Sequence, residues 1–336
     1  MGQCMPSNER QLPEGFDSYD SITDAQKHNL ETWESTGVTN LYSTGIPQLD
    51  KYMGGGFGKD GDFEIVLIHS QPKTYKSTLA LLFMMDAAKR GIPQGWVILE
   101  GSLAEALNRL RKCFDPYEEF DKLIPNMEKC VFAMSKKMRR SNYSLGDILK
   151  WMRYLNSTKG VNLFFIDPLG YAFDFSTRDP YENEWSRQAR FMQELAAFGE
   201  DTNSTIVIVQ HNTKDSSGPN ASYRAAAVGG SATLTKTATK AIEIRREKDE
   251  VTGTGEQFRR IALEMYFSRH TFDHTRQPLL MDIYQRNDKK GLHIFVPTFT
   301  ESSAEHAFGD KAEKGRSVWR GQIDSNESDL EELMNG

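Results

Sequence analysis

Four short apolar segments, separated by amphipathic stretches, organise the middle of this chain. Each is rich in β-branched or aromatic residues and does not alternate strictly, which is typical of strands buried on both faces of a parallel sheet. These segments cover residues 64–68, 95–99, 161–166 and 205–209. The amphipathic stretches predict helices over residues 77–89, 103–113, 145–156 and 184–199. Alternating strands and helices predict a doubly wound, mainly parallel α/β sheet with helices on both faces.

The two ends of the chain differ from this middle. Residues 1–40 are polar with little periodicity, so we expect an arm or linker with at most a helix near residues 24–34. Residues 298–336 form a polar, acidic tail, a composition that is usually mobile. The core domain is therefore expected to span residues 41–297. Its last part predicts a strand-rich extension of the sheet, built from residues 241–245, 260–268 and 279–285.

Polar residues follow the predicted core strands where each strand ends. The first strand leads into Ser70–Ser77, and Glu100, Asp167 and the pair Gln210-His211 follow the other three. Because the carboxyl ends of parallel strands meet at one edge of the sheet, we expect these groups to lie together. That edge is where open α/β sheets bind their ligands.

The segment Ser70–Ser77 has the order of a phosphate-binding loop. Such a loop needs a strand, a tight turn, a lysine and a hydroxyl that opens a helix, usually written G-x-x-x-x-G-K-[ST]. Here Ser70 and Tyr75 replace the two glycines, so we expect an aromatic-flanked loop that binds ATP in a somewhat altered shape. The expected nucleotide contacts are Ser70, Gln71, Pro72, Lys73, Thr74, Tyr75, Lys76, Ser77 and Thr78. The plainer alternative is a polar turn before a helix that contains Lys-Ser by chance.

The other strand ends fit the remaining chemistry of ATP hydrolysis. Lys76 would neutralise the β- and γ-phosphates, while Ser77 and Asp167 would hold Mg²⁺. Glu100 would polarise the attacking water. A lone strand-end carboxylate is otherwise an ordinary solvated group. Either Gln210 or His211 could sense the γ-phosphate.

Two further predictions concern cations outside these strand ends. Arg269 could reach a neighbouring subunit's γ-phosphate as an arginine finger, with Arg276 as its nearest competitor. The segment 212–230 holds sparse cations and small residues, a composition that suits contacts with a single-stranded DNA backbone. Plain surface cations and a surface loop without a ligand are the alternatives. The DNA contacts expected there are Lys214, Arg224, Gly229 and Gly230.

Overall composition limits the class of protein. The formal net charge of −6 argues against nucleic-acid binding over the whole surface, but a local basic loop or ring channel remains compatible with it. Three cysteines without a CxxC pair indicate neither a disulfide scaffold nor a zinc site. No apolar run is long enough for a membrane span, and no secretory signal is visible. We therefore expect a cytoplasmic protein, of phage origin, without membrane contacts.

The ordered motifs resemble those of the RecA-like P-loop ATPases. The lead-in Ser43–Asp50 with the glycines of residues 54–56 resembles the start of RecA-like cores. Residues 99–110 resemble the glutamate-bearing motif of DnaB-type hexameric helicases. Residues 165–169 and 209–214 resemble motifs of Twinkle and RepA-like helicases, as does the segment from Gly230 to Arg245 that follows them. Residues 266–273 resemble the arginine-finger motif, without the usual flanking lysine or cysteine. The resemblance covers residues 42–297 and implies ATP, Mg²⁺, single-stranded DNA and a homo-oligomer.

One motif resembles a different branch of the same superfamily. Residues 72–77, Pro-Lys-Thr-Tyr-Lys-Ser, are similar to the phosphate loop of phage strand-exchange recombinases, which carries a lysine and an aromatic residue. That branch also opens a DNA-binding loop after the fourth strand and can end in an acidic tail. Such a tail could bind replication or recombination proteins.

Three functions therefore remain open. The first is a hexameric, ring-shaped replicative helicase of phage type that couples ATP hydrolysis to movement on single-stranded DNA. The second is a RecA-like recombinase that forms ATP-dependent filaments on single-stranded DNA. The third is a non-catalytic DNA-binding subunit whose nucleotide site has degraded. Motif order favours the first, and the phosphate loop favours the second.

Overall fold

The computed structural model describes ten stretches of the chain. They are residues 40–53, 55–59, 63–112, 117–135, 145–170, 184–212, 232–251, 257–268, 278–287 and 293–301. Asn40–Gly336 form one compact unit, which begins next to the domain boundary expected from the sequence. The helix expected near residues 24–34 lies outside the described residues.

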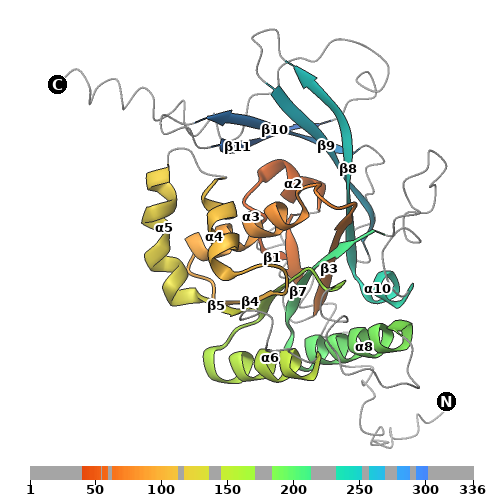
Figure 1. Cartoon of the computed structure of the whole chain (residues 1–336). Coiled ribbons are helices and arrows are strands. Elements are labelled where there is room, and N and C mark those ends of the chain that lie inside the picture. Colours follow the sequence, from red (N-terminus) through yellow and green to blue (C-terminus); the bar gives the residue numbers. More distant parts are fainter. Residues whose placement is uncertain are drawn as a thin grey trace, which may run out of the picture. The chain divides into compact units, whose positions relative to one another are not determined.

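A nine-stranded sheet forms the centre of this unit, in the order β11-β10-β9-β8-β3-β7-β6-β4-β5 (Figure 1). The six strands from β8 to β5 pair in parallel, and β9, β10 and β11 continue the sheet antiparallel. The parallel strands are β3 (Glu64–Ser70), β4 (Gln94–Ile98), β5 (Val131–Ser135), β6 (Leu163–Asp167), β7 (Thr205–His211) and β8 (Lys240–Val251). The antiparallel strands are β9 (Gln257–Ser268), β10 (Leu279–Asn287) and β11 (His293–Glu301).

Helices cover both faces of the parallel strands (Figure 1). One apolar cluster joins the sheet to α3 (Lys76–Lys89), α4 (Leu103–Arg111) and α5 (Tyr117–Cys130). A second cluster joins the opposite face to α6 (Leu145–Lys159), α8 (Glu184–Thr202) and α10 (Ala232–Thr237). The predicted fold class is therefore confirmed: a doubly wound, mainly parallel sheet with a strand-rich C-terminal extension.

Side-chain alternation along β3 separates the two faces. Val66 and Ile68 belong to the cluster of α3, whereas Ile65 and Leu67 belong to the cluster of α6 and α8. On the same pattern His69, the residue after Ile68, falls on the face of Ile65 and Leu67. This division decides which groups at the strand ends can meet over α3.

Three elements were not predicted from the sequence. Helix α5 has a proline, Pro125, within it, which obscures its helical period. Strand β5 lies at the edge of the sheet and is only half-buried, so it lacks a continuous apolar run. Strand β11, at the opposite edge, contains Pro297, a residue tolerated on edge strands, and ends at Glu301.

The lead-in motif has a structural role. It forms the two-stranded sheet of β1 (Asn40–Tyr42) and β2 (Phe57–Lys59), joined by α2 (Pro47–Tyr52). The carboxylate of Asp50 accepts hydrogen bonds from the backbone and hydroxyl of Thr44, each at 2.7 Å. Gly56 has a φ of +115°, and a Cβ there would lie 2.3 Å from the Tyr42 carbonyl oxygen. The aspartate and the glycine therefore hold this turn closed.

A buried ion pair connects this lead-in to the sheet. Lys240 Nζ lies 3.1 Å from Glu64 Oε1, and both side chains are fully buried. Lys240 also donates to the Gly56 carbonyl at 2.9 Å, while Glu64 Oε2 accepts from the Gly58 amide at 2.5 Å. Several hydrogen bonds thus compensate the removal of both charges from water.

Candidate nucleotide-binding site

The segment Ser70–Ser77 forms a closed turn between β3 and α3. The carbonyl oxygen of Gln71 accepts hydrogen bonds from Lys76 Nζ at 2.7 Å, from Thr74 Oγ1 at 2.7 Å and from Ser70 Oγ at 3.0 Å. The Ser70 and Thr74 hydroxyls also contact each other. Side chains thus brace a turn in which the glycines of the usual pattern are absent.

Tyr75 adopts the backbone conformation that a glycine would normally supply. Its φ is +67° and its ψ is 17°, in the left-handed region, and α3 begins at the next residue. Lys73 also has a positive φ, of +63°. The ring of Tyr75 packs against the apolar cluster of α3. The loop therefore achieves its curvature with two non-glycine residues in strained backbone conformations, each of which costs on the order of 1–3 kcal/mol.

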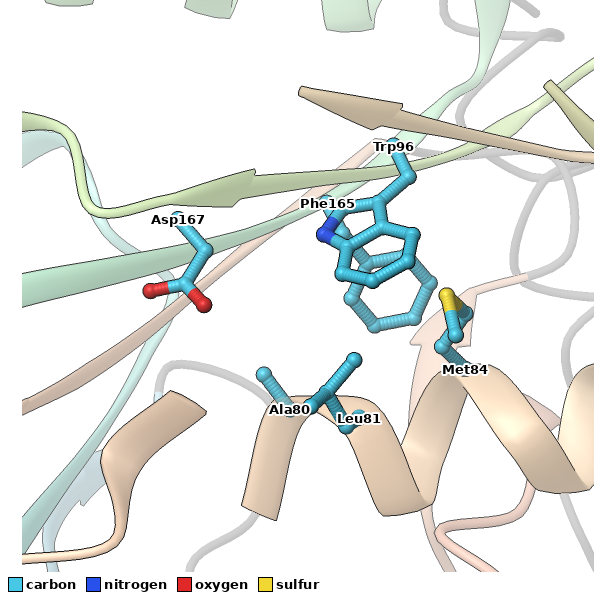
Figure 2. Close-up of a pocket in the computed structure, with 6 residues that line it drawn as sticks. All are labelled: Ala80, Leu81, Met84, Trp96, Phe165 and Asp167. Atoms are coloured by element: carbon cyan, nitrogen blue, oxygen red, sulfur yellow. The ribbon is translucent and has the colours of Figure 1, made fainter. Parts of the chain in front are cut away.

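The hydroxyl of Ser77 and the carboxylate of Asp167 meet at this loop. Ser77 Oγ donates to Asp167 Oδ1 at 2.9 Å, although 90 residues separate them in sequence. Figure 2 shows the Asp167 carboxylate beside Ala80 and Leu81 of α3, with Phe165 and Trp96 lining the adjoining apolar pocket. The first turn of α3 and the end of β6 thus place a hydroxyl and a carboxylate together, as Mg²⁺ coordination requires.

Burial shifts the pKa values of two charged groups here. Burial raises the pKa of Asp167 to about 6, and the Ser77 hydrogen bond and the charge of Arg109 oppose this rise. Burial lowers the pKa of Lys76 to about 8, while the charges of Asp167 and Glu100 act in the opposite direction. Shifted pKa values of this kind are typical of functional sites, and a bound polyphosphate with its metal would favour both charged forms.

Glu100 and His211 share the electrostatic environment of Lys76. The pKa of His211 is lowered by burial and by the charge of Lys76, whereas the charge of Glu100 raises it. The side chain of Glu100 is exposed to solvent. The backbone holds it in place, because the amide of Leu99 donates to the Asp167 carbonyl at 2.9 Å.

Gln210 has a different environment from His211. It is 4% exposed, and its Oε1 accepts a hydrogen bond from the Gly170 amide at 2.8 Å. Its neighbours Ile206 and Ile208 belong to the cluster of α6 and α8, so strand alternation places Gln210 on the face opposite α3. Gln210 therefore ties the segment after β6 to β7, and its role as a sensor stays a prediction.

Several predicted residues lie outside the described part of the chain. They are Arg269, Arg276, Lys214, Arg224, Gly229 and Gly230. The predicted arginine finger and DNA contacts therefore stay predictions.

Three residues at this edge were not given a role from the sequence. Arg109 of α4 acts on the pKa of Asp167, and its signal was its place in the glutamate-bearing motif. His69 and Asn212 form a hydrogen bond of 2.8 Å beside the phosphate loop. Neither His69 nor Asn212 belongs to the usual phosphate-loop pattern, so sequence spacing alone could not find this pair.

The residues present fit a nucleotide with Mg²⁺. Mg²⁺ commonly takes one or two protein oxygens and completes its shell with water and phosphate oxygens, and Ser77 and Asp167 would supply that pair. Among the described residues there is no cluster of three or more histidine, cysteine or acidic side chains that would form a metal site of its own. No helix in the described stretches is long and apolar enough to cross a membrane.

Known proteins resemble this chain in structure more clearly than in sequence. No protein-family model matches the sequence, and no curated protein matches it. The ATPase domain of a DnaB-like helicase is similar, with a TM-score of 0.63 and 13% identity over 84% of this chain and 99% of that domain. The KaiC-like protein PH0186 from Pyrococcus horikoshii OT3 is also similar, with a TM-score of 0.52 and 15% identity over 77% of this chain and 100% of that one. With its strand order and its phosphate loop, the chain has the fold of the RecA-like P-loop ATPases.

Proposed function

We propose that this chain is an ATP-dependent DNA motor that acts as a ring-forming replicative helicase of phage type. One observation carries the ATPase part of this proposal: Ser77 and Asp167 are hydrogen-bonded at 2.9 Å, within electrostatic range of Lys76, at the carboxyl edge of a parallel sheet. A cation, a hydroxyl and a carboxylate in this order are what a phosphate with Mg²⁺ requires.

Each group has a defined part in hydrolysis. Lys76 would exchange its bond with the Gln71 carbonyl for contacts with the β- and γ-phosphates. Mg²⁺, held by Ser77 and Asp167, would supply neutralisation of the phosphate charge. Glu100 would accept the proton of the attacking water, because its carboxylate is exposed and acts on the pKa values of Lys76 and His211.

The coupling to DNA rests on the order of motifs along the chain. His211, beside Lys76, and Gln210 would report the state of the γ-phosphate to the segment that begins after Asn212. That segment would bind single-stranded DNA through Lys214, Arg224, Gly229 and Gly230. In a ring, Arg269 would reach the phosphate bound to a neighbouring subunit, so active sites would form between subunits.

A forked-duplex assay tests the helicase part. With ATP and Mg²⁺ the purified protein is expected to separate the strands, and Lys76→Ala should abolish this. A protein that shows DNA-stimulated ATP hydrolysis without unwinding under any condition would contradict the helicase function while keeping the motor.

A recombinase is the second candidate. Lys73 and Tyr75 both have positive φ in a phosphate loop that resembles the phage strand-exchange enzymes, and this favours the recombinase. Electron microscopy on single-stranded DNA with a non-hydrolysable ATP analogue separates the two candidates. Closed rings support the helicase, and helical filaments support the recombinase.

A non-catalytic subunit is the third candidate. The pairing of Ser77 with Asp167 argues against it, because a degraded site has no need to keep a buried carboxylate with a raised pKa. This candidate would be favoured if Lys76→Ala left all DNA-related function intact.

A further inference from the structure

Two hydrogen bonds join the start of the phosphate loop to the residue after β7. The backbone amide of Asn212 donates to the Ser70 carbonyl at 2.8 Å. In the side chains, His69 Nδ1 lies 2.8 Å from Asn212 Oδ1. Because a carbonyl oxygen only accepts, this contact requires the tautomer in which Nδ1 of His69 carries the hydrogen. Asn212 is thus held at both its backbone and its side chain.

His69 is fully buried in a strand that is otherwise apolar up to Ser70. At its level in the sheet, the neighbouring positions are Gln210 on β7 and Glu243 on β8. Burial lowers the pKa of His69 to about 4, and the charge of Lys76 lowers it further, against the effect of the Asn212 hydrogen bond. The imidazole is therefore neutral near pH 7, so it holds Asn212 as a fixed donor rather than as a charge.

A purely structural role does not account well for this pair. An apolar side chain would pack in β3 without the cost of burying a polar ring. Asn212 is only partly buried and could be solvated instead. What the pair does provide is a fixed distance between the first residue of the phosphate loop and the last described residue after β7. The segment proposed to bind DNA begins at the next residue.

We propose that His69 is a positioning residue that couples the nucleotide site to DNA binding. Its imidazole holds Asn212, so that a movement of Ser70–Ser77 on nucleotide exchange is passed to the start of the DNA-binding segment. This inference rests on the proposed function. It differs from the sensor role of Gln210 and His211, because His69 contacts neither phosphate nor DNA.

The position of His69 allows coupling to be separated from hydrolysis. Strand alternation places it on the face of Ile65 and Leu67, whereas Ser77 and Asp167 meet on the α3 face. A substitution at His69 should therefore leave the basal machinery in place. His69→Phe keeps a planar ring without a donor, and His69→Asn keeps a donor close to the Nδ1 position.

The test compares ATP hydrolysis with and without poly(dT) for the full-length wild type, His69→Phe and His69→Asn. His69→Phe is expected to keep kcat without DNA and the KM for ATP within about threefold, while stimulation by DNA falls about tenfold. His69→Asn should recover most of that stimulation. Thermal melting shows whether each variant is folded.

A second variant covers the case in which His69→Phe does not fold. Asn212→Ala removes the same bond from outside the core, and it should reduce stimulation to a similar degree. The double variant should lose no more than either single one, because both remove one interaction.

Two outcomes would overturn the inference. One is a folded His69→Phe or Asn212→Ala variant with wild-type stimulation by DNA. The other is a loss in which basal and stimulated rates fall together, which indicates a structural role. If the wild type itself hydrolyses ATP without any response to DNA, the proposed function fails as well, and the inference fails with it.

Discussion

Tyr75 is the residue whose backbone departs most from what its side chain prefers. Its φ of +67° lies in the left-handed region, which costs a non-glycine residue about 1–2 kcal/mol. Substitution by alanine and by glycine both remove the ring, but only glycine also relieves the backbone. We therefore predict that Tyr75→Gly unfolds at a higher urea concentration than Tyr75→Ala, by about 1 kcal/mol in the free energy of unfolding.

Lys150 supplies the matched control for this comparison. It is an exposed residue within α6, where alanine is favoured over glycine by about 1 kcal/mol. The order of the two variants should therefore reverse between positions 75 and 150. Alanine more stable than glycine at position 75 would contradict the left-handed conformation of the loop.

Asp167 shows how a functional group can destabilise the fold. Burial raises its pKa to about 6 from an ordinary value near 3.8, so the folded chain binds this proton more tightly than the unfolded chain. The contribution of Asp167 to stability is therefore present at low pH and is lost as pH rises through 4 to 6. Asparagine cannot ionise and escapes this loss.

The second prediction follows from that sign. In EDTA, the free energy of unfolding of Asp167→Asn relative to wild type should increase by about 2 kcal/mol between pH 4 and pH 7. The variant should also lose ATP hydrolysis. Asp201→Asn, at an exposed ion pair, should change stability by less than about 1 kcal/mol. An advantage of Asp167→Asn that does not depend on pH would show that the carboxylate is not buried as described.

Sequence reasoning identified some of these residues better than others. Lys76, Ser77 and Asp167 follow from motif order, and the structure brings Ser77 and Asp167 into contact. The backbone of Tyr75 could not be predicted, because side chains of the loop, not glycines, close the turn. The bond between His69 and Asn212 depends on strand register, which a single sequence does not reveal.

At the scale of elements, the ion pair between Glu64 and Lys240 connects the lead-in to the sheet. Lys240→Met would leave the Glu64 carboxylate buried without its cation, so we predict a loss of about 3–5 kcal/mol in the free energy of unfolding. The double variant with Glu64→Gln removes both charges and still accepts a hydrogen bond from Gly58. It should recover more than half of the loss.

An exposed pair again provides the comparison. Arg153 lies 3.5 Å from Asp201 on the surface, and Arg153→Met should cost less than about 1 kcal/mol. Urea unfolding of the wild type and these variants measures all these differences. A Lys240→Met variant as stable as Arg153→Met would contradict the burial of the pair.

The predictability of the elements follows their burial. Strands β3, β4, β6 and β7 are buried throughout or nearly so, and their apolar runs were visible in the sequence. The edge strands β5 and β11 have no neighbour on one side within the described sheet, so they need no such run. The proline within α5 hid that helix for a different reason, since it breaks the helical pattern.

At the scale of the whole molecule, the fold and the function have different support. The strand order and the similarity to the DnaB-like helicase ATPase domain and to the KaiC-like protein PH0186 establish the fold. Helicase and recombinase share this fold, and one chain does not encode the difference in its core. Ring or filament is decided between subunits, by groups such as Arg269 that act across an interface.

The most direct test of the central claim is ATP hydrolysis by the wild type and by Lys76→Ala at saturating Mg²⁺, with and without single-stranded DNA. We predict that the wild type hydrolyses ATP, that DNA accelerates the reaction, and that Lys76→Ala lowers kcat at least about a hundredfold while remaining folded. A wild type that neither binds nor hydrolyses ATP, or a Lys76→Ala variant with an unchanged rate, would contradict the account.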